Sequence, residues 1–279
     1  MPITCYGSKH TRDVKQDYLK RLVQMKIDKV KIDNPDEEFI FVDATAGDGF
    51  NKVQGKVEDG SALIVHKLLY EAFGIDGKWR LIANDSKKSF YNSLHGNLDH
   101  LAVRLANGGS VLNGFKSNWY AVYQAIRERI DIRNEKYQDL FNDTEGEISS
   151  EGIIYIDPPG MVDFDCMPNI ITQIPNADIY CHIGCAGIKR QKNRWKTGDK
   201  RTFEERFEQV RWYKNHWLIS DVYPKHHWIF LYGVDDHKLA ESIEQNNDMN
   251  FTSIESTLGI QRLEICNYTK EELVYNYGN

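Results

Sequence analysis

The sequence contains no long apolar run. No stretch approaches the roughly 18 consecutive apolar residues that cross a bilayer as a helix. The segment from Met1 to Arg12 also lacks the apolar centre of a secretory signal peptide. We therefore expect a protein that neither spans a membrane nor is exported, with the cytoplasm as its compartment.

Cysteine is also scarce. The five cysteines are Cys5, Cys166, Cys181, Cys185 and Cys266. An odd number scattered through a long chain is not typical of a disulfide framework. The cysteines therefore favour a reducing compartment, in agreement with a cytoplasmic location.

A metal site receives little support. Cys181, His182 and Cys185 bring together residue types that bind metals, but no second Cys/His pair follows at the spacing of a zinc ribbon. A cysteine in a buried strand is commonly a small hydrophobic residue. We predict no metal here, and we assign no role to His226 and His227, which are expected in an exposed loop.

Three common catalytic motifs are missing. A dinucleotide-binding loop would read GxGxxG, but Lys52 occupies the position of the third glycine after Gly47. No GxxxxGK[ST] phosphate-binding loop and no GxSxG nucleophile elbow occur either. These absences argue against a nicotinamide dehydrogenase, a P-loop nucleotide hydrolase and an α/β-hydrolase.

The composition is that of a globular protein. The 279 residues are 41% hydrophobic and 27% charged, and no internal repeat is visible. This length suits one main domain with extensions. We predict a helical extension over residues 1–37, a main domain over residues 38–235 and a C-terminal extension over residues 236–279.

The charge is distributed unevenly. The chain carries a net charge of −6, yet residues 187–214 hold ten basic and four acidic residues, so this segment is +6 and the remainder −12. Such a segment favours an anionic partner. A solvated helix face is the alternative explanation, since many charged runs have no partner.

Helical and strand patterns alternate along the chain. Helices are predicted over residues 11–30, 61–73 and 86–106, from Ser117 to about residue 130, and from the capping box of Thr202 and Glu205 to Tyr213. Strands are predicted over residues 39–42, 79–83, 110–112, 153–156, 177–183, 217–222 and 228–233. This order predicts a doubly wound α/β fold with a mostly parallel, seven-stranded sheet and an antiparallel C-terminal hairpin.

A glycine loop follows the first predicted strand. Asp43 closes the strand, and Gly47 and Gly49 follow in a segment where the backbone can turn sharply and approach a ligand. Asn84 and Asp85 stand directly after the second predicted strand, where a carboxylate can accept the hydroxyls of a ribose. Together they predict a pocket for an adenosine-type cofactor, against the alternative of ordinary strand-to-helix turns.

A second motif, Asp157-Pro158-Pro159-Gly160, follows the predicted strand over residues 153–156. Two successive prolines end the strand and stiffen the loop. The Asp157 carboxylate and the Pro158 carbonyl can then accept hydrogen bonds from one exocyclic amino group and expose its nitrogen for reaction. The alternative is a turn that only terminates the strand.

In these motifs, DATAGDG, ND and DPPG, the chain resembles the class I S-adenosylmethionine-dependent methyltransferases over roughly residues 38–235. Within that family, DPP followed by an aromatic residue is typical of enzymes that methylate exocyclic amino groups of nucleic-acid bases, mainly adenine. A fainter similarity, through Asp59-Gly60-Ser61-Ala62-Leu63, is to the three-Cys-motif partner proteins.

The resemblance implies a Rossmann-like fold and S-adenosyl-L-methionine as cofactor. The cofactor-binding residues that it implies are Asp43, Ala44, Gly47, Gly49, Asp85 and Asn113. Of these, Asp85 is expected to take the ribose hydroxyls and Asn113 to approach the adenine. The catalytic residues that it implies are Asp157, Pro158 and Pro159, which hold the target amino group.

The chain departs from the family at Gly160, where an aromatic residue normally stacks on the target base. Stacking then needs another ring. Candidate substrate-binding rings are Phe164, Trp119 and Trp195, and candidate phosphate contacts are Lys189, Arg190, Lys192 and Arg194.

The sequence therefore predicts a methyltransferase acting on an exocyclic amino group of a nucleic-acid base, with adenine N6 in DNA as the first expectation. An RNA base methyltransferase and a non-catalytic binding protein of the same fold are the alternatives. A protein partner that supplies target recognition is also compatible with a chain of this size.

Overall fold

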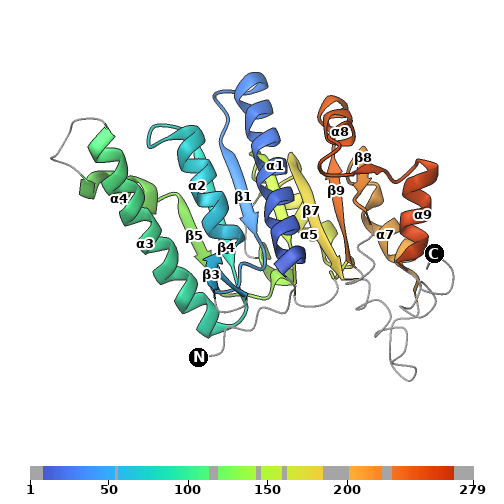
Figure 1. Cartoon of the computed structure of the whole chain (residues 1–279), viewed down its shortest axis with the longest axis horizontal. Coiled ribbons are helices and arrows are strands. Elements are labelled where there is room, and N and C mark those ends of the chain that lie inside the picture. The colour runs from blue at the N-terminus through green and yellow to red at the C-terminus, as the bar shows by residue number, and fades with distance from the viewer. Residues whose placement is uncertain are drawn as a thin grey trace. The chain divides into compact units, whose positions relative to one another are not determined.

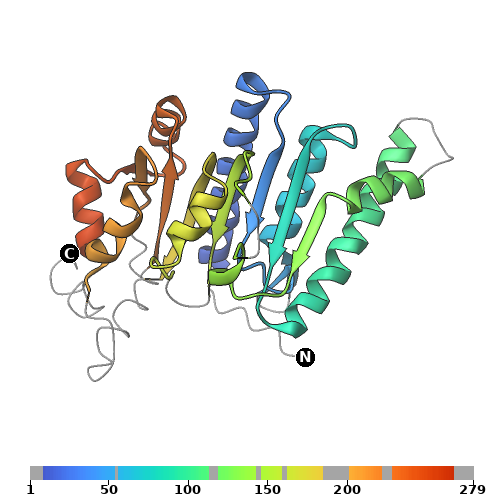
Figure 2. The same ribbon diagram turned by 180° about the vertical axis from the view of Figure 1, so that it is seen from behind.

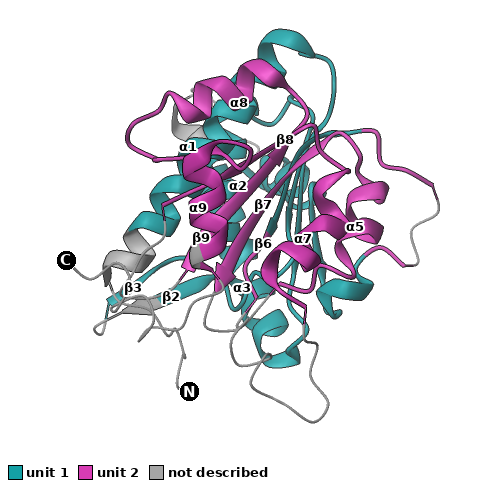
Figure 3. Cartoon of the chain, turned by 90° about the vertical axis from the view of Figure 1, so that its right-hand side faces the viewer, with its two compact units in different colours: residues 1–140, 150–155 teal, residues 141–149, 156–279 magenta. Residues whose placement is uncertain are grey.

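A computed structural model of the chain describes residues 9–53, 56–112, 119–142, 146–158, 162–184, 201–221 and 228–266 (Figures 1 and 2). The fold is α/β, with a mixed sheet of eight strands and a separate two-stranded hairpin. The chain divides into two compact units (Figure 3). Unit 1 comprises Met1–Leu140 and Ser150–Tyr155, and unit 2 comprises Phe141–Ser149 and Ile156–Asn279.

The strands of unit 1 are parallel. Their order is β6 (Glu151–Ile156), β1 (Phe39–Asp43), β4 (Trp79–Asn84) and β5 (Ile130–Arg133). All five residues of β1 are buried, as expected for a strand with neighbours on both edges and helices on a face. Asp43 lies opposite Ala83 of β4 and Tyr155 of β6, so the carboxyl ends of these strands meet at one edge.

Helices cover one face of these strands. They are α1 (Lys9–Asp33), α2 (Ser61–Phe73) and α3 (Lys88–Leu112), which face the viewer in Figure 1, and α4 (Trp119–Arg127) packs against α3. The hairpin of β2 (Phe50–Val53) and β3 (Lys56–Asp59) links the first strand to α2, and a 3₁₀ turn spans Tyr137–Asp139. Apolar side chains at helical spacing form the core beneath α1 and α2, including Leu22, Ile27, Leu63 and Leu69.

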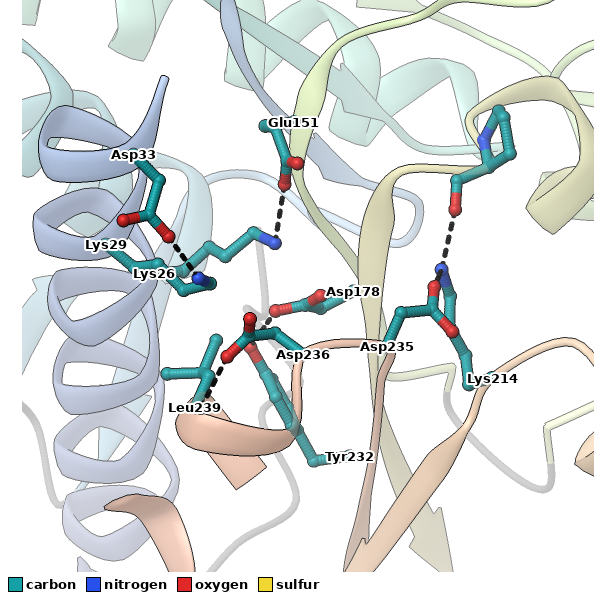
Figure 4. Close-up of polar contacts among 11 residues, drawn as sticks. Lys26, Lys29, Asp33, Glu151, Asp178, Lys214, Tyr232, Asp235, Asp236 and Leu239 are labelled. Atoms are coloured by element: carbon teal, nitrogen blue, oxygen red, sulfur yellow. Dashed lines mark hydrogen bonds and ion pairs between the residues drawn. The ribbon is translucent and has the colours of Figure 1, made fainter. Parts of the chain in front are cut away.

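A buried ion pair fixes α1 to the first residue of β6. The Nζ atom of Lys26 lies 2.7 Å from a carboxylate oxygen of Glu151 (Figure 4). Lys26 is only 3% exposed. Removing either partner would leave a charge poorly compensated, which is strongly destabilising in a buried setting.

The strands of unit 2 are antiparallel. β9 (Trp228–Val234) pairs with β7 (Ala177–Gly184) and with β8 (His216–Ile219), and β8 pairs with β10 (Thr252–Ser253). The helices are α5 (Met167–Gln173), α7 (Phe203–Arg211), α8 (His237–Glu244) and α9 (Thr257–Ile265). Figure 4 shows two polar contacts that hold this unit: Tyr232 donates to Asp178, and Lys214 binds Asp235.

Most predicted elements are confirmed. The α/β class, the parallel strands and the antiparallel C-terminal pair occur as expected. α2 has the predicted bounds, and the capping box of Thr202 and Glu205 is formed at α7. No helix in the described ranges combines the length and hydropathy needed to cross a membrane. The division of the chain at residues 37 and 235 stays a prediction.

One strand assignment is wrong. Residues 110–112 belong to α3, and the fourth parallel strand is β5, whose first residue, Ile130, is predicted at the end of a helix. The helix continues through Gly108 and Gly109, which resemble helix breakers but are tolerated within a long helix. The guanidinium of Arg129 donates to the carbonyl oxygens of Ala125, Ile75 and Gly77, which ties the segment between α4 and β5 to the loop between α2 and β4.

Candidate active site

The loop after β1 presents an open backbone surface at Gly47. Gly47 and Gly49 have φ values of 63° and 84°, in the left-handed region that favours glycine. The loop is held to β4 by the N–H of Ala46, which donates to the carbonyl oxygen of Asn84 at 2.8 Å. A Cβ atom placed on Gly47 would meet no heavy atom within 4 Å, whereas one on Gly49 would lie 3.1 Å from Leu94. Gly47 thus faces open space, and Gly49 faces the core.

The carboxylate of Asp85 lies beside this loop and is hydrogen-bonded to it. Its Oδ2 accepts from the N–H of Gly47 at 3.1 Å, and its Oδ1 accepts from the N–H of Lys87 at 2.7 Å. A carboxylate has about four acceptor positions, so both oxygens keep capacity for further donors. Partial burial is the main cause that raises the pKa of Asp85 above its ordinary value. Asp85 can therefore accept two neighbouring hydroxyl groups beside the glycine loop.

Asp43 is buried at the end of β1. Its side chain is fully buried, accepts a hydrogen bond from the Ser61 hydroxyl at the start of α2, and accepts from the N–H of Thr45 at 3.3 Å. Ala44 is also buried, and its N–H donates to the backbone carbonyl oxygen of Tyr155 at 3.0 Å. Asp43 and Ala44 thus support the loop from beneath. Ser61 was not singled out from the sequence, although its place at the start of the helix after the loop is a usable signal.

Asn84 joins three strand ends. It is 1% exposed, and its amide nitrogen donates to the carbonyl oxygens of Ala44 and Glu135 at 3.0 and 3.1 Å. Its amide oxygen accepts from the N–H of Glu135 at 3.0 Å. One side chain therefore joins the carboxyl ends of β1, β4 and β5. These bonds hold the glycine loop and Asp85 in fixed positions relative to each other.

The expected adenine contact, Asn113, lies outside the described residues and stays a prediction. The segment before it is the end of α3 instead of a strand. The residues that follow the true strand are Asn134 and Glu135. The side-chain amide of Asn134 donates to the carbonyl oxygen of Asp85 at 2.7 Å, so Asn134 stands beside the proposed ribose-binding residue.

In unit 2, Asp157 pairs with a histidine. Its Oδ1 lies 2.6 Å from Nδ1 of His182, which is on β7. The two side chains are 24% and 12% exposed, and the imidazole contacts the rings of Trp228 and Phe230 at centroid distances of 5.5 and 5.3 Å. A carboxylate that accepts from Nδ1–H fixes the orientation of the imidazole, and the imidazole in turn fixes the carboxylate.

Sequence reasoning missed this role of His182. It considered the residue only as a metal ligand, although His182 stands near the end of one predicted strand and Asp157 directly after another. Within the described ranges, no group of three or more His, Cys, Asp or Glu side chains is placed to hold a metal ion. Neighbouring Cys181 is buried, and burial raises the pKa of its thiol, so it behaves as a small hydrophobic residue.

The two described aromatic candidates for substrate binding differ in their exposure to solvent. Phe164 is 2% exposed and packs edge-on against Phe203 at 5.6 Å, so its ring belongs to the core of unit 2. Trp119 is 43% exposed at the start of α4, beside Tyr120, which is 58% exposed. Trp119 is therefore the candidate with an accessible ring. Pro158 is described, and the remaining candidates, Pro159, Lys189, Arg190, Lys192, Arg194 and Trp195, lie outside the described residues.

No protein-family model and no curated protein matches the sequence. The solved structures similar to the chain include the following three. Protein LPL1258 of Legionella pneumophila, from family DUF519, is 10% identical, with 85% of this chain and 95% of that chain covered and a TM-score of 0.46. The N-terminal domain of human METTL16 is 10% identical, with 85% and 74% covered and a TM-score of 0.42. An rRNA methylase from Streptococcus thermophilus is 12% identical, with 79% and 94% covered and a TM-score of 0.36.

Proposed function

We propose that the chain is an S-adenosylmethionine-dependent methyltransferase that acts on an exocyclic amino group of a nucleic-acid base, with adenine N6 in DNA as the first substrate. The observation that carries the proposal is the glycine loop held against Asp85. Gly47 offers bare backbone on its open side, and the Asp85 carboxylate lies one hydrogen bond away from it. This pair suits a nucleoside with two hydroxyl groups.

The residues present fit the cofactor. Asp85 would accept the ribose hydroxyls, and the open side of Gly47 would admit the ligand against the backbone. Asp43 and Asn84 would keep this loop in shape from beneath. When bound, S-adenosylmethionine supplies a methyl group on a positively charged sulfur, which leaves as a neutral thioether.

Asp157 is the proposed contact for the target amino group. It follows Tyr155 by two residues, and Tyr155 lies opposite Asp43 in the parallel register of β6 and β1. A nitrogen that gains a methyl group must release a proton. The Asp157 carboxylate would accept a hydrogen bond from the amino N–H and then take that proton, while His182 holds the carboxylate in place through Nδ1.

Nucleic acid is proposed as substrate for two reasons. Residues 189–196 hold five basic residues and no acidic residue in a chain of net charge −6, which favours a phosphate-bearing partner. Trp119 has an exposed ring, and base stacking on an aromatic side chain contributes roughly 1–3 kcal/mol per base. The same site in an RNA methyltransferase would differ in the surface around it.

Transfer of a tritiated methyl group to DNA and to RNA, followed by mass spectrometry of the nucleosides, tests the proposal. N6-methyladenine in DNA is the expected product, and Asp157→Asn is the matched control without transfer. Methylation of RNA alone would support the RNA alternative. Binding of the cofactor without transfer to either polymer would support a non-catalytic protein, for which Gly160 is the sequence argument. Absence of cofactor binding would overturn the proposal.

A further inference from the structure

A groove of about 300 Å³ lies within unit 2. One wall is α7 and the other is α9 with the two residues Ile254 and Glu255 that precede it (both helices are labelled in Figure 3). On α7, the lining residues Glu204, Phe207, Glu208 and Arg211 recur at the three- and four-residue spacing of one helix face. The groove therefore presents two helix faces to a ligand.

The floor of the groove is apolar. Phe207, Ile254 and Leu263 are 2%, 5% and 9% exposed and form a closed base. Ile260 lies three residues before Leu263 on α9 and is 48% exposed. An isoleucine half exposed above an apolar base is an anchor point that an aliphatic or aromatic side chain of a partner would cover.

The rim of the groove is acidic. Glu204, Glu208, Glu255 and Glu264 surround it, and Arg211 is the basic residue among the lining side chains. The guanidinium of Arg211 donates to Glu208 at 2.8 Å and also to Glu255, and these hydrogen bonds raise the pKa of Arg211. The lining carries a formal charge of −3, which repels phosphate groups and anionic lipids and attracts a cationic partner.

We propose that this groove docks an amphipathic α-helix of a partner protein, with aliphatic side chains on one face and lysine or arginine along both flanks. A third helix suits a groove between two helices because side chains at positions i, i+3, i+4 and i+7 reach the floor together. The flanking cations of such a helix meet a rim whose net charge is −3 after Arg211 is counted. The proposal is independent of the methyltransferase assignment.

A designed, capped 16-residue peptide tests the proposal. It carries leucine at positions i, i+3, i+4 and i+7, and lysine with alanine elsewhere. Fluorescence anisotropy with the full chain at 150 mM salt is expected to give micromolar binding. A peptide of the same composition in scrambled order, and one with glutamate in place of lysine, are each expected to bind at least tenfold more weakly.

Matched variants locate the binding site. Ile260→Asp is expected to weaken binding at least tenfold, whereas Leu258→Asp is expected to change it less than twofold, because Leu258 is equally exposed on the same helix, at 49%, but does not line the groove. Glu264→Lys should likewise weaken binding, whereas Glu241→Lys on α8 should not. Circular dichroism of each variant confirms that it is folded.

Three results would overturn the proposal. Equal binding of the ordered and scrambled peptides would show that charge alone is responsible. Equal losses of peptide affinity in Ile260→Asp and Leu258→Asp would show that the peptide does not bind in the groove. Sedimentation showing a dimer that Ile260→Asp converts to monomer would identify a second copy of the chain as the occupant.

Discussion

The Nδ1 atom of His182 lies 2.6 Å from the Oδ1 atom of Asp157, although the two residues are 25 positions apart in the sequence. Two aromatic rings of β9, those of Trp228 and Phe230, flank the imidazole. This packing holds the imidazole in place and limits water around the pair. Asp157 is therefore a carboxylate with a fixed, titratable neighbour, and the proposed proton transfer depends on both.

Replacing Asp157 with asparagine should separate chemistry from cofactor binding. We expect Asp157→Asn to reduce methyl transfer by at least about 10²-fold, the usual scale for a positioned proton acceptor, and to leave the affinity for S-adenosylmethionine unchanged. Single-turnover transfer and calorimetry measure the two quantities. Transfer at the wild-type rate would rule out the proposed role of Asp157.

His182→Gln tests the positioning role of His182. Glutamine can still donate to Asp157, so we expect partial transfer activity with unchanged affinity for S-adenosylmethionine. His182→Phe should lose more activity, because it lacks the hydrogen bond. Equal activities of the glutamine and phenylalanine variants would show that this hydrogen bond does not contribute to transfer.

Gly47→Ala should weaken cofactor binding for a steric reason. A methyl group on Gly47 enters the open space in which we place the ligand, and we expect at least a tenfold loss of affinity by calorimetry. Gly74→Ala is the matched control, since Gly74 has a φ value of 65° against 63° for Gly47 and also has open space around its Cβ position. Alanine at either position is strained by the positive φ value. Equal losses of affinity in the two variants would therefore be explained by strain and would show that the glycine loop does not bind the cofactor. Gly49 is unsuitable for this test, because its side chain would press on Leu94.

Asp85→Asn should weaken cofactor binding by about 1–3 kcal/mol, the typical effect of losing hydrogen bonds to a carboxylate. Burial raises the pKa of Asp85, so its ionised form is lost at a higher pH than for an ordinary carboxyl as the solution is acidified. The affinity of the wild type for the cofactor should therefore begin to fall at a higher pH than it would with an ordinary aspartate. The asparagine variant should not show this fall. Identical pH dependence in both proteins would exclude Asp85 from the site.

The elements with strong local signals were predictable from the sequence. Phe39 to Val42 form an apolar run that only a buried strand explains, and Ser61 to Phe73 have clear helical periodicity. The positions of Gly47 and Asp85 after successive strands also predicted their proximity, because parallel strands end at the same edge. These inferences needed only periodicity and strand order.

Other features depend on tertiary contacts that the sequence does not encode locally. Ser110 to Leu112 have strand-forming character but continue a helix, and Ile130, the first residue of β5, lies at the end of a helical pattern. The burial of Asp43 follows from the packing of Ser61 against it. The pairing of Asp157 with His182 requires two distant segments to meet, and no motif spacing records that contact.

The basic segment makes a prediction about nucleic-acid affinity. If Lys189, Arg190, Lys192 and Arg194 contact phosphates, their joint replacement by alanine should flatten the dependence of affinity on salt by several released counterions. Cofactor affinity should stay the same. If these residues are instead a solvated surface, both the affinity and the salt dependence should be those of the wild type, because exposed charges without a partner contribute little. Anisotropy with labelled DNA and RNA at several salt concentrations distinguishes the two.

His66 should make the protein sensitive to acid. It is fully buried on α2 against the Trp79 ring at 5.8 Å, neither of its ring nitrogens has a hydrogen-bond partner within the described residues, and burial lowers its pKa to about 4. The unfolded chain binds this proton with the ordinary pKa near 6.5, so stability is lost as pH falls from about 6.5 toward 4, by about 3 kcal/mol in total. His66→Phe keeps a ring of similar shape without the titration, so urea unfolding at successive pH values should show a smaller loss than in the wild type. His237→Gln, at an exposed position of α8, is the control and should follow the wild-type curve. An equally steep loss in His66→Phe would assign the acid sensitivity to other groups.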